Sequence, residues 1–372
     1  MYIDALRLKD FRNYAAEDAV FFEGLNIFKG SNASGKTNLL EAVYVCGVGK
    51  SLRTNQDKEM VRWDVPEASV KLTLVKKYGK HDIEIFIDSK GKKRVLIDGI
   101  AQVRMAELLG YLNIVFFSPD ELKLIKEGPS ERRRFMDISL CQQSRLYLKS
   151  LSAYNKALTQ RNKILKTAYN AETVRNMLDV FDVQLAKYGA PIIEIRKRFV
   201  ANISQTAAEW HSKISGGTES LSIAYESPIA DDGLTAREIT DVLIRKYAKD
   251  RERDTETQFT NSGPHRDDLK VIVNGVDIRK FGSQGQQRSA ALSLKLAEIE
   301  SFRIETGETP VLLLDDVLSE LDLARQKNLL DATKGIQTIL TCTHFDIGTD
   351  VGYREYIVTE GKIVGQTDIY KE

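Results

Sequence analysis

The sequence predicts an α/β protein in which a strand-rich lobe is split by a long helical insertion. Three observations lead to this prediction. Segments with the apolar patterns of strands occupy the first and last parts of the chain. A glycine-rich loop connects one of these strands to a helix. The middle part instead repeats its apolar residues at helical spacings, as paired helices do.

The strands expected in the first part of the chain are short. Residues 25–29 are mostly apolar and end at the glycine-rich loop, after which a helix is expected over 38–45. Segments 69–77 and 82–88 alternate apolar and polar residues, which predicts strands with one face in the core. Segment 113–117 is apolar apart from its first residue, which favours burial on both faces.

The middle of the chain is expected to form an antiparallel helical hairpin. Apolar residues follow heptad spacing from Tyr147 to Leu165 and again from Leu178 to Ile214. Residues 167–173 form the expected loop between the two helices. Gly189 and Pro191 predict a kink or a break in the second helix.

The last part of the chain returns to alternating strands and helices. Strands are expected at 271–273, 311–314 and 338–342, and helices at 286–303 and 321–333. The predicted lobes are therefore a strand-rich lobe at 1–117 plus 265–372 and a helical lobe at 118–264.

Composition excludes several classes of protein. The 54 basic and 53 acidic side chains leave a net charge of +1, so any affinity for nucleic acid must come from local patches. The longest apolar run, 42–46, is far shorter than the roughly 20 residues that cross a bilayer. The N-terminus has no secretory signal, and three widely spaced cysteines fit reduced thiols. We therefore expect a cytoplasmic protein that is not embedded in a membrane.

Residues 30–37 match the phosphate-binding motif G-x-x-x-x-G-K-[ST] in full. They are Gly30, Ser31, Asn32, Ala33, Ser34, Gly35, Lys36 and Thr37. Backbone N–H groups of such a loop surround phosphate oxygens, and the following helix N-terminus favours negative charge. Lys36 is expected to reach the β- and γ-phosphates, and the Thr37 hydroxyl to bind Mg²⁺. A chance match is disfavoured because a strand and a helix flank the loop.

Two adjacent carboxylates follow the apolar segment 311–314. Ligands of parallel α/β sheets bind at the carboxyl ends of the strands. Asp315 is expected to hold Mg²⁺ through water, and Asp316 to orient or deprotonate an attacking water. An acidic turn without function is the alternative, which the phosphate-binding motif makes less favourable.

Four further features occur in a characteristic order. Arg12 lies in the segment LKDFRN near the start, and residues 283–288 (SQGQQR) precede a helix with Ser283 as its expected N-cap. Residues 319–322 follow the two aspartates, and His344 follows the last expected strand. Together with the phosphate loop they resemble the ABC-type ATPases, and within them the SMC-like branch that works on DNA. The resemblance implies that 283–288 are the signature, 319–322 the D-loop and His344 the switch histidine.

Three more segments narrow the resemblance to the RecF family of bacterial recombination-repair proteins. They are FSPDEL at 117–122, GPSERRRFMD at 128–137 and GPHRDDL at 263–269. This resemblance covers essentially the whole chain. It implies an ABC-type P-loop ATPase head with an inserted helical lobe that carries a short antiparallel coiled-coil-like hairpin.

The resemblance also implies an activity and partners. ATP and Mg²⁺ are the expected cofactors of a weak ATPase, with Asp316, His344 and Ser283 in catalysis and Arg12 beside the phosphate loop. Ser283 is expected to face the nucleotide of a second copy, so that ATP holds a homodimer on DNA and hydrolysis releases it. RecO and RecR are the implied partners, which help place RecA on single-stranded gaps.

Two departures from the ABC pattern bear on this activity. Asp316 stands where a glutamate is usual, and its shorter side chain suggests slow hydrolysis. No glutamine that would sense the γ-phosphate is evident near 117–120, so the coupling of the lobes to ATP is left open.

Candidate DNA contacts are basic residues of the insertion and of strand ends. Three lysines seven residues apart share one face of the first hairpin helix: Lys149, Lys156 and Lys163. Arg132 precedes that helix, and lysine clusters occupy 76–80 and 90–94. Ordinary solvated lysines are the alternative. No aromatic-rich platform for single strands is evident, so contacts with the backbone of duplex DNA are expected.

Two other classes of protein share the phosphate loop. The ATPase subunit of a membrane transporter is disfavoured by the long heptad insertion. A small-molecule kinase is disfavoured because the signature serine and the switch histidine have no role in one.

Overall fold

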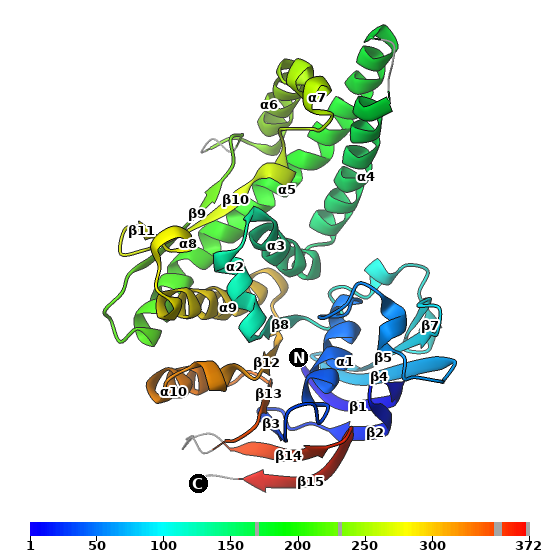
Figure 1. Cartoon of the computed structure of the whole chain (residues 1–372), viewed down its shortest axis with the longest axis vertical. Coiled ribbons are helices and arrows are strands. Elements are labelled where there is room, and N and C mark those ends of the chain that lie inside the picture. The colour runs from blue at the N-terminus through cyan, green and yellow to red at the C-terminus, as the bar shows by residue number, and fades with distance from the viewer. Residues whose placement is uncertain (168–170, 230–232, 346–351, 370–372) are drawn as a thin grey trace. The chain divides into compact units, whose positions relative to one another are not determined.

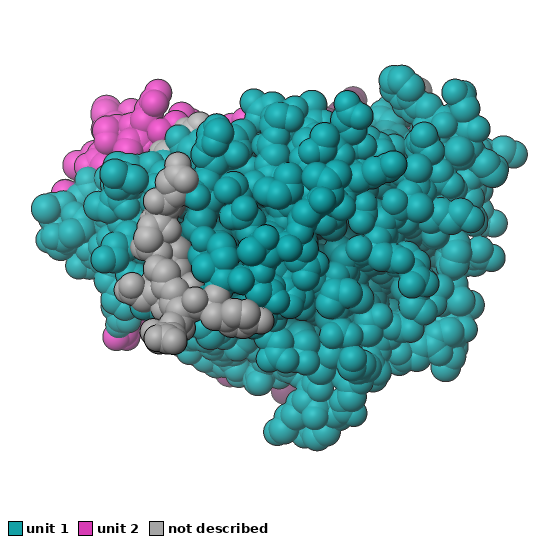
Figure 2. All heavy atoms as spheres, turned by 90° about the horizontal axis from the view of Figure 1, so that it is seen from below, with its two compact units in different colours: residues 1–122, 209–219, 291–372 teal, residues 123–208, 220–290 magenta. Residues whose placement is uncertain are grey.

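The computed structural model describes residues 1–167, 171–229, 233–345 and 352–369 (Figure 1). These residues form two compact units, which are coloured separately in Figure 2. Unit 1 comprises 1–122, 209–219 and 291–372, and unit 2 comprises 123–208 and 220–290. No helix in the described ranges combines the length and the apolar character that crossing a membrane requires.

This division differs from the predicted lobes at three places. Residues 118–122, which were expected in the helical lobe, belong to unit 1. Residues 265–290 belong to unit 2, because strand β10 (Asp268–Val273) pairs with β9 (Leu221–Glu226) of that unit. Residues 209–219 belong to unit 1, where the Lys213 carbonyl accepts a hydrogen bond from Asn328 at 3.0 Å. Sequence patterns along the chain do not show such pairings, which join distant segments.

A mostly parallel six-stranded sheet of unit 1 carries the phosphate loop. Its order is β15-β14-β3-β13-β12-β8, and only β14 and β15 pair antiparallel. The strands are β3 (Leu25–Lys29), β8 (Ile114–Phe117), β12 (Val311–Asp315), β13 (Thr338–Cys342), β14 (Tyr353–Thr359) and β15 (Lys362–Ile369). The first four confirm predicted strands, and their apolar residues are largely buried. Strands β14 and β15 had no clear apolar pattern and were not expected, and of these two only β15 is an exposed edge strand.

The second six-stranded sheet of unit 1 is antiparallel, in the order β2-β1-β4-β5-β6-β7. Its strands are β1 (Tyr2–Phe11), β2 (Tyr14–Val20), β4 (Glu67–Lys76), β5 (Gly79–Asp88), β6 (Lys93–Ile97) and β7 (Ile100–Ala101). The alternation in β4 and β5 buries every second residue, as the sequence predicted.

Helix α1 (Lys36–Val48) packs against both sheets of unit 1 (Figure 1). Leu39 and Val43 of α1 share one hydrophobic core with Leu72 of β4 and Leu313 of β12. Because it is covered on both sides, α1 is apolar around most of its circumference, and residues 39–47 are all buried. The helix that begins at the phosphate loop is therefore held rigidly by the core.

The other helices of unit 1 are short or shared. They are η1 (Asp57–Met60), η2 (Met105–Glu107), η3 (Pro119–Leu122), η5 (Val317–Glu320), α10 (Leu323–Ala332) and the second part of α9 (Gln284–Thr306), whose first part belongs to unit 2.

Unit 2 is mainly helical. Its helices are α2 (Lys123–Lys126), α3 (Pro129–Gln143), α4 (Arg145–Thr167), α5 (Ala171–Ile214, whose end belongs to unit 1), α6 (Ala236–Lys249), α7 (Arg251–Thr257), η4 (Pro264–Arg266) and α8 (Ile278–Phe281). A small antiparallel sheet, in the order β11-β10-β9, adds β11 (Val276–Asp277).

Helices α4 and α5 form the predicted antiparallel hairpin. The loop expected at 167–173 is shorter, because α5 already begins at Ala171, and residues 168–170 lie outside the described ranges. Of the kink or break expected near Gly189 and Pro191, the break is wrong, because α5 runs unbroken past both residues, and the kink stays a prediction. Buried neighbours hold the helix together here: Ala190, Ile192 and Ile193 are completely buried.

Buried arginines join the helices of unit 2. Arg161, which is fully buried, donates to Asp182 of α5 at 2.8 Å and to Asp254 of α7 at 2.7 Å. Arg196 of α5 donates to Asp137 of α3 at 2.7 Å and to the Tyr147 hydroxyl of α4 at 2.8 Å. The heptad pattern predicted an apolar interior. The structure instead joins these helices partly by charge-assisted hydrogen bonds.

The segment GPHRDDL packs into this polar interior. Gly263 has φ +116°, and a Cβ atom there would lie 2.4 Å from the Tyr154 hydroxyl, so another residue would not fit. His265 lies 2.7 Å from that hydroxyl through Nδ1, and its Nε2–H donates to the Thr260 carbonyl at 2.9 Å. Burial lowers the pKa of His265 to about 4, so the imidazole is neutral at physiological pH.

Candidate nucleotide site

The phosphate loop folds tightly between β3 and α1. Gly30 is required because a Cβ atom would lie 2.3 Å from the Val358 carbonyl oxygen. Gly35 has φ +117°, and a Cβ atom there would lie 2.7 Å from Asn13 Nδ2. The Gly35 carbonyl accepts a hydrogen bond from the Tyr14 hydroxyl at 3.1 Å. The loop therefore has one compact shape, in which α1 presents its N-terminal N–H groups.

Lys36 and Ser34 have polar atoms suited to a phosphate group. The Lys36 ammonium donates to the loop carbonyls of Gly30 at 2.6 Å and Ser31 at 2.8 Å. Burial lowers the pKa of this ammonium, while the nearby Asp316 and Asp315 carboxylates raise it. The Ser34 hydroxyl is buried and has no hydrogen-bond partner in the described part of the chain. An anion with several acceptor oxygens can replace the loop carbonyls as the partner of the Lys36 ammonium.

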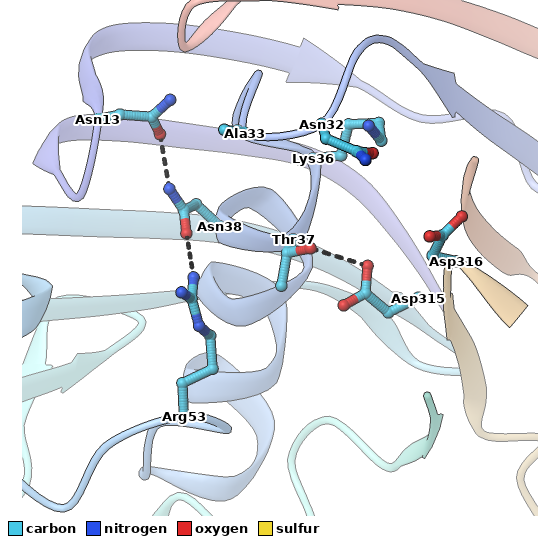
Figure 3. Close-up of a pocket in the computed structure, with 10 residues that line it drawn as sticks. Asn13, Asn32, Ala33, Lys36, Thr37, Asn38, Arg53, Asp315 and Asp316 are labelled. Carbon is cyan, nitrogen blue, oxygen red and sulfur yellow. Dashed lines mark hydrogen bonds between the residues drawn. The ribbon is translucent and has the colours of Figure 1, made fainter. Parts of the chain in front are cut away.

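Thr37 and Asp315 approach each other across the mouth of the loop (Figure 3). Thr37 Oγ1 donates to Asp315 Oδ1 at 3.0 Å, and Thr341 Oγ1 of β13 donates to the same oxygen at 2.7 Å. A hydroxyl and a carboxylate are hard oxygen ligands, and Mg²⁺ commonly takes only one or two such ligands beside phosphate and water. The pair therefore fits the predicted metal site.

Asp316 follows β12 in a left-handed conformation, with φ 50°. Its backbone N–H lies 3.1 Å from the Thr341 carbonyl oxygen and 3.0 Å from the Thr341 hydroxyl, which holds the turn in place. Aspartate adopts this region more readily than most side chains. The turn directs the carboxylate into the same cavity as Lys36 (Figure 3).

A cavity of about 520 Å³ joins these groups. Its lining residues are Asn13, Asn32, Ala33, Gly35, Lys36, Thr37, Asn38, Arg53, Asp315 and Asp316, all in unit 1. The cavity is not lined by three residues of the predicted loop, Gly30, Ser31 and Ser34. The carbonyls of Gly30 and Ser31 nevertheless accept hydrogen bonds from the Lys36 ammonium.

Three lining residues were missed by sequence reasoning. Arg53 donates to Asn38 at 2.9 Å, and Asn38 donates to Asn13 at 2.8 Å (Figure 3). Asn13 in turn donates to the Ser34 carbonyl at 3.3 Å. Asn38 follows the motif directly and could have been included. Asn13 and Arg53 come from other segments, so only the fold brings them to the loop.

The Arg12 guanidinium forms hydrogen bonds with other residues of the protein beside the site. Its guanidinium donates to both carboxylate oxygens of the buried Glu41 of α1, at 2.7 and 2.8 Å, and to the Glu59 carbonyl at 2.6 Å. It does not line the cavity of about 520 Å³. A direct contact between Arg12 and a nucleotide stays a prediction.

The signature serine caps its helix as expected. The Ser283 hydroxyl accepts from the Gln286 N–H at 3.2 Å, and Gln286 Oε1 accepts from the Ser283 N–H at 3.0 Å. Ser283 is exposed and lies in unit 2. His344 is exposed just after β13, and the Ser319 hydroxyl donates to the Asp316 carbonyl at 2.7 Å. The catalytic roles of Ser283 and His344 stay predictions.

The predicted DNA contacts divide into two groups. Lys149, Lys156 and Lys163 are exposed on α4, and none has an ion-pair partner in the described ranges. Arg132 requires a correction, because it is 3% exposed and its guanidinium is paired with Asp268 at 2.6 Å. Its other donors bond backbone carbonyls of Leu124 and Glu127. Arg132 joins α3 to β10 and is not available to DNA.

Comparison with known proteins identifies the family of this fold. Residues 2–347 match the family model of the RecF/RecN/SMC N-terminal domain. A DNA replication and repair protein RecF from Lachnospira eligens is 43% identical and covers 98% of this chain and 100% of its own length. The chain belongs to the RecF family. A second RecF protein, from Clostridium kluyveri, is 46% identical over 93% of this chain and 94% of its own.

Solved structures agree with this RecF-family assignment. The recombination mediator protein RecF with ATPrS, from the RecFOR pathway, superimposes with a TM-score of 0.89 at 34% identity, covering 97% of each chain. The corresponding RecF–ATP structure gives 0.88, covering 99% of this chain and 98% of that one. An SMC head bound to ScpA gives 0.59 at 19% identity, covering 100% and 98%, and shows the fold alone. The predicted ABC-type head with a helical insertion is confirmed.

Proposed function

We propose that this RecF-family chain is an ATP-dependent DNA-binding protein of replication and recombinational repair. The observation that carries the proposal is the cavity in which Lys36, Thr37, Asp315 and Asp316 converge. Its groups suit a triphosphate with Mg²⁺, and the relatives named for ATP share the fold over almost the whole chain. ATP is therefore the proposed ligand, and Mg²⁺ the proposed metal.

A second copy completes the proposed site. Every lining residue of the cavity of about 520 Å³ belongs to unit 1, whereas the exposed Ser283 starts α9 in unit 2. The N-terminus of a 23-residue helix has free N–H groups and a positive dipole end, which suit the γ-phosphate of a nucleotide held by another copy. ATP would then stabilise a homodimer by mass action.

The residues of the site support slow hydrolysis. Thr37 and Asp315 would hold Mg²⁺, which when bound neutralises charge on the phosphates. Asp316 would accept a proton from the attacking water. Its side chain is one methylene shorter than glutamate and projects from an anchored turn, so it reaches less far toward that water. We propose that hydrolysis acts as a weak switch that releases the dimer from DNA.

The remaining parts of the proposal follow the names of the relatives. These are called DNA replication and repair proteins and are placed in the RecFOR pathway. We propose that the chain acts in the cytoplasm at gapped or junction DNA. RecO and RecR are the proposed partners, and the proposed outcome is the placing of RecA on single-stranded gaps.

The decisive experiment for the dimer is sedimentation with and without ATP in the presence of a gapped duplex. We expect the Ser283→Arg variant to bind ATP as the wild type does but to stay monomeric, because the added cation occupies the space next to the partner's nucleotide. Val276→Arg, which adds the same charge at another exposed position of unit 2, should dimerise normally. A Ser283→Arg protein that pairs with ATP would count against the shared site.

The lysine face of α4 gives a separate prediction about DNA. Changing Lys149, Lys156 and Lys163 together to alanine should weaken DNA binding and reduce the slope of log affinity against log salt by about 2 to 3, at about 0.9 for each phosphate that a lysine no longer neutralises. Changing the same three residues to arginine keeps the charge and should leave the slope near that of the wild type. An unaltered slope in the alanine variant would show that these lysines only solvate the helix.

A further inference from the structure

Trp63 is an unusually exposed aromatic residue of unit 1. Its side chain is 91% exposed, more than that of any other large aromatic residue in the described ranges. Tryptophan is normally covered over most of its surface, because its ring is the largest apolar group in proteins. A ring left almost wholly in water therefore points to a binding role.

The backbone that carries Trp63 is fixed. The Arg62 N–H donates to the Asp10 carbonyl at 2.8 Å, and the Arg12 N–H donates to the Met60 carbonyl at 2.8 Å. Val61 forms a bridge with Phe11 at the end of β1 and is only 5% exposed. The ring thus projects from an anchored segment, so little backbone freedom is lost when it is covered.

A cavity of about 470 Å³ lies beside the ring. Its lining residues are Arg12, Lys58, Glu59, Val61, Arg62, Trp63, Asp64, Val65 and Ser89. Val61 and Val65 are the apolar aliphatic residues of this lining, and the others besides Trp63 carry basic, acidic or hydroxyl groups. An occupant with a flat apolar face and polar edges matches this lining.

One exposed lysine, Lys58, lines this cavity, and two more, Lys90 and Lys92, closely follow the lining residue Ser89 in the chain. Lys58, Lys90 and Lys92 have no ion-pair partner in the described part of the chain. The turn that carries Lys90 and Lys92 is fastened next to the cavity, because the Ser89 N–H donates to the Pro66 carbonyl at 2.9 Å.

The acidic groups near these lysines are partly engaged. Asp57 pairs with Lys93 at 2.7 Å, and Asp88 accepts from the N–H groups of Lys90 and Lys92. Glu59 and Asp64 remain exposed on the same cavity. The lysine ammonium groups are thus available to an anion, and the carboxylates of Glu59 and Asp64 line the same cavity.

We propose that Trp63 is a stacking platform for an unpaired DNA base, with Lys58, Lys90 and Lys92 contacting the adjoining phosphates. Stacked bases of intact duplex do not offer a free face, whereas the bases of a single-stranded segment do. The proposal rests on the proposed DNA binding and narrows its substrate to DNA with an unpaired strand. The sequence shows no aromatic-rich platform for single strands, and the proposal requires only one rigidly held ring, which is sufficient for one base.

Fluorescence tests the stacking directly. The chain has two tryptophans, Trp63 and Trp210, so the Trp210→Phe variant reports on Trp63 alone. We expect its emission to be quenched by a duplex with a single-stranded tail, and to change little with the blunt form of the same duplex.

Affinity measurements test the energetic role of the ring. Trp63→Leu should bind the tailed duplex about tenfold more weakly, in line with the loss of one base–aromatic stack. The matched variant Trp63→Phe keeps a flat aromatic face and should lose much less. Both variants should bind the blunt duplex as the wild type does.

Three outcomes would overturn the proposal. One is the absence of quenching by tailed DNA, and another is equal affinity of Trp63→Leu and the wild type for that DNA. The third is a loss of ATP-dependent pairing in Trp63→Leu without DNA, which would make Trp63 a contact between copies. If the wild type binds neither form of DNA, the proposed function itself fails, and this result is distinct from the other three.

Discussion

Replacing Lys36 by alanine is expected to abolish ATP binding and, with it, ATP-dependent pairing. The Lys36 ammonium is the one lysine lining the phosphate-loop cavity in the described ranges, and it is held across the loop by two carbonyls. With nucleotide bound, the same donors can serve the β- and γ-phosphates. Two charge-assisted hydrogen bonds at about 1.5–3 kcal/mol each correspond to a loss of affinity on the order of 10²- to 10⁴-fold. Equilibrium nucleotide binding and sedimentation measure both effects.

Lys29→Ala is the matched control for this prediction. Lys29 ends β3 just before the loop, and its ammonium faces Glu355 at 3.3 Å instead of the cavity. We expect this variant to bind ATP and to pair as the wild type does. Pairing of Lys36→Ala with ATP would contradict the idea that the triphosphate holds the two copies together.

Replacing Asp316 by asparagine should separate binding from hydrolysis. Asparagine has nearly the same shape and tolerates the left-handed backbone at this position, so the turn and its contacts with Thr341 should persist. Loss of the basic carboxylate should slow hydrolysis on the order of 10²- to 10⁴-fold. ATP affinity should stay the same or rise, because one negative charge beside the phosphates is removed. Phosphate release, nucleotide binding and dimer lifetime are the measurements.

Asp315→Asn gives the contrasting result. Asp315 accepts from both Thr37 and Thr341, and it is the carboxylate that suits Mg²⁺. We expect this variant to lose magnesium-dependent nucleotide binding as well as hydrolysis. If Asp316→Asn also lost nucleotide affinity, Asp316 would be a structural residue of the turn and not the group that activates water.

Local patterns were sufficient where one segment carries the whole signal. The phosphate loop is such a case, because its glycines, its lysine and its flanking strand and helix are contiguous. Strands β3 and β13 begin and end at the predicted residues, and all their side chains are buried except that of Lys29 at the end of β3, which is half-buried. The Ser283 cap was also predicted correctly, because a capping contact spans only three residues.

Patterns failed where the partner of a side chain is distant in the sequence. Arg132 resembled an exposed basic residue in an arginine run, but Asp268 pairs with it from 136 residues away. Arg161 occupies the hairpin interior although the heptad pattern marks that interior as apolar, because Asp182 and Asp254 satisfy its charge there.

The sequence by itself determined the phosphate-binding motif, the family and four strands of the parallel sheet, because these depend on contiguous motifs and on short-range patterns. Only the tertiary structure decided which basic residues are exposed without an ion-pair partner, that Asn13 and Arg53 reach the phosphate loop, and that Trp63 is exposed beside a cavity. Exposure and charge pairing are properties of surfaces brought together from many segments, and these exist only once the chain has folded.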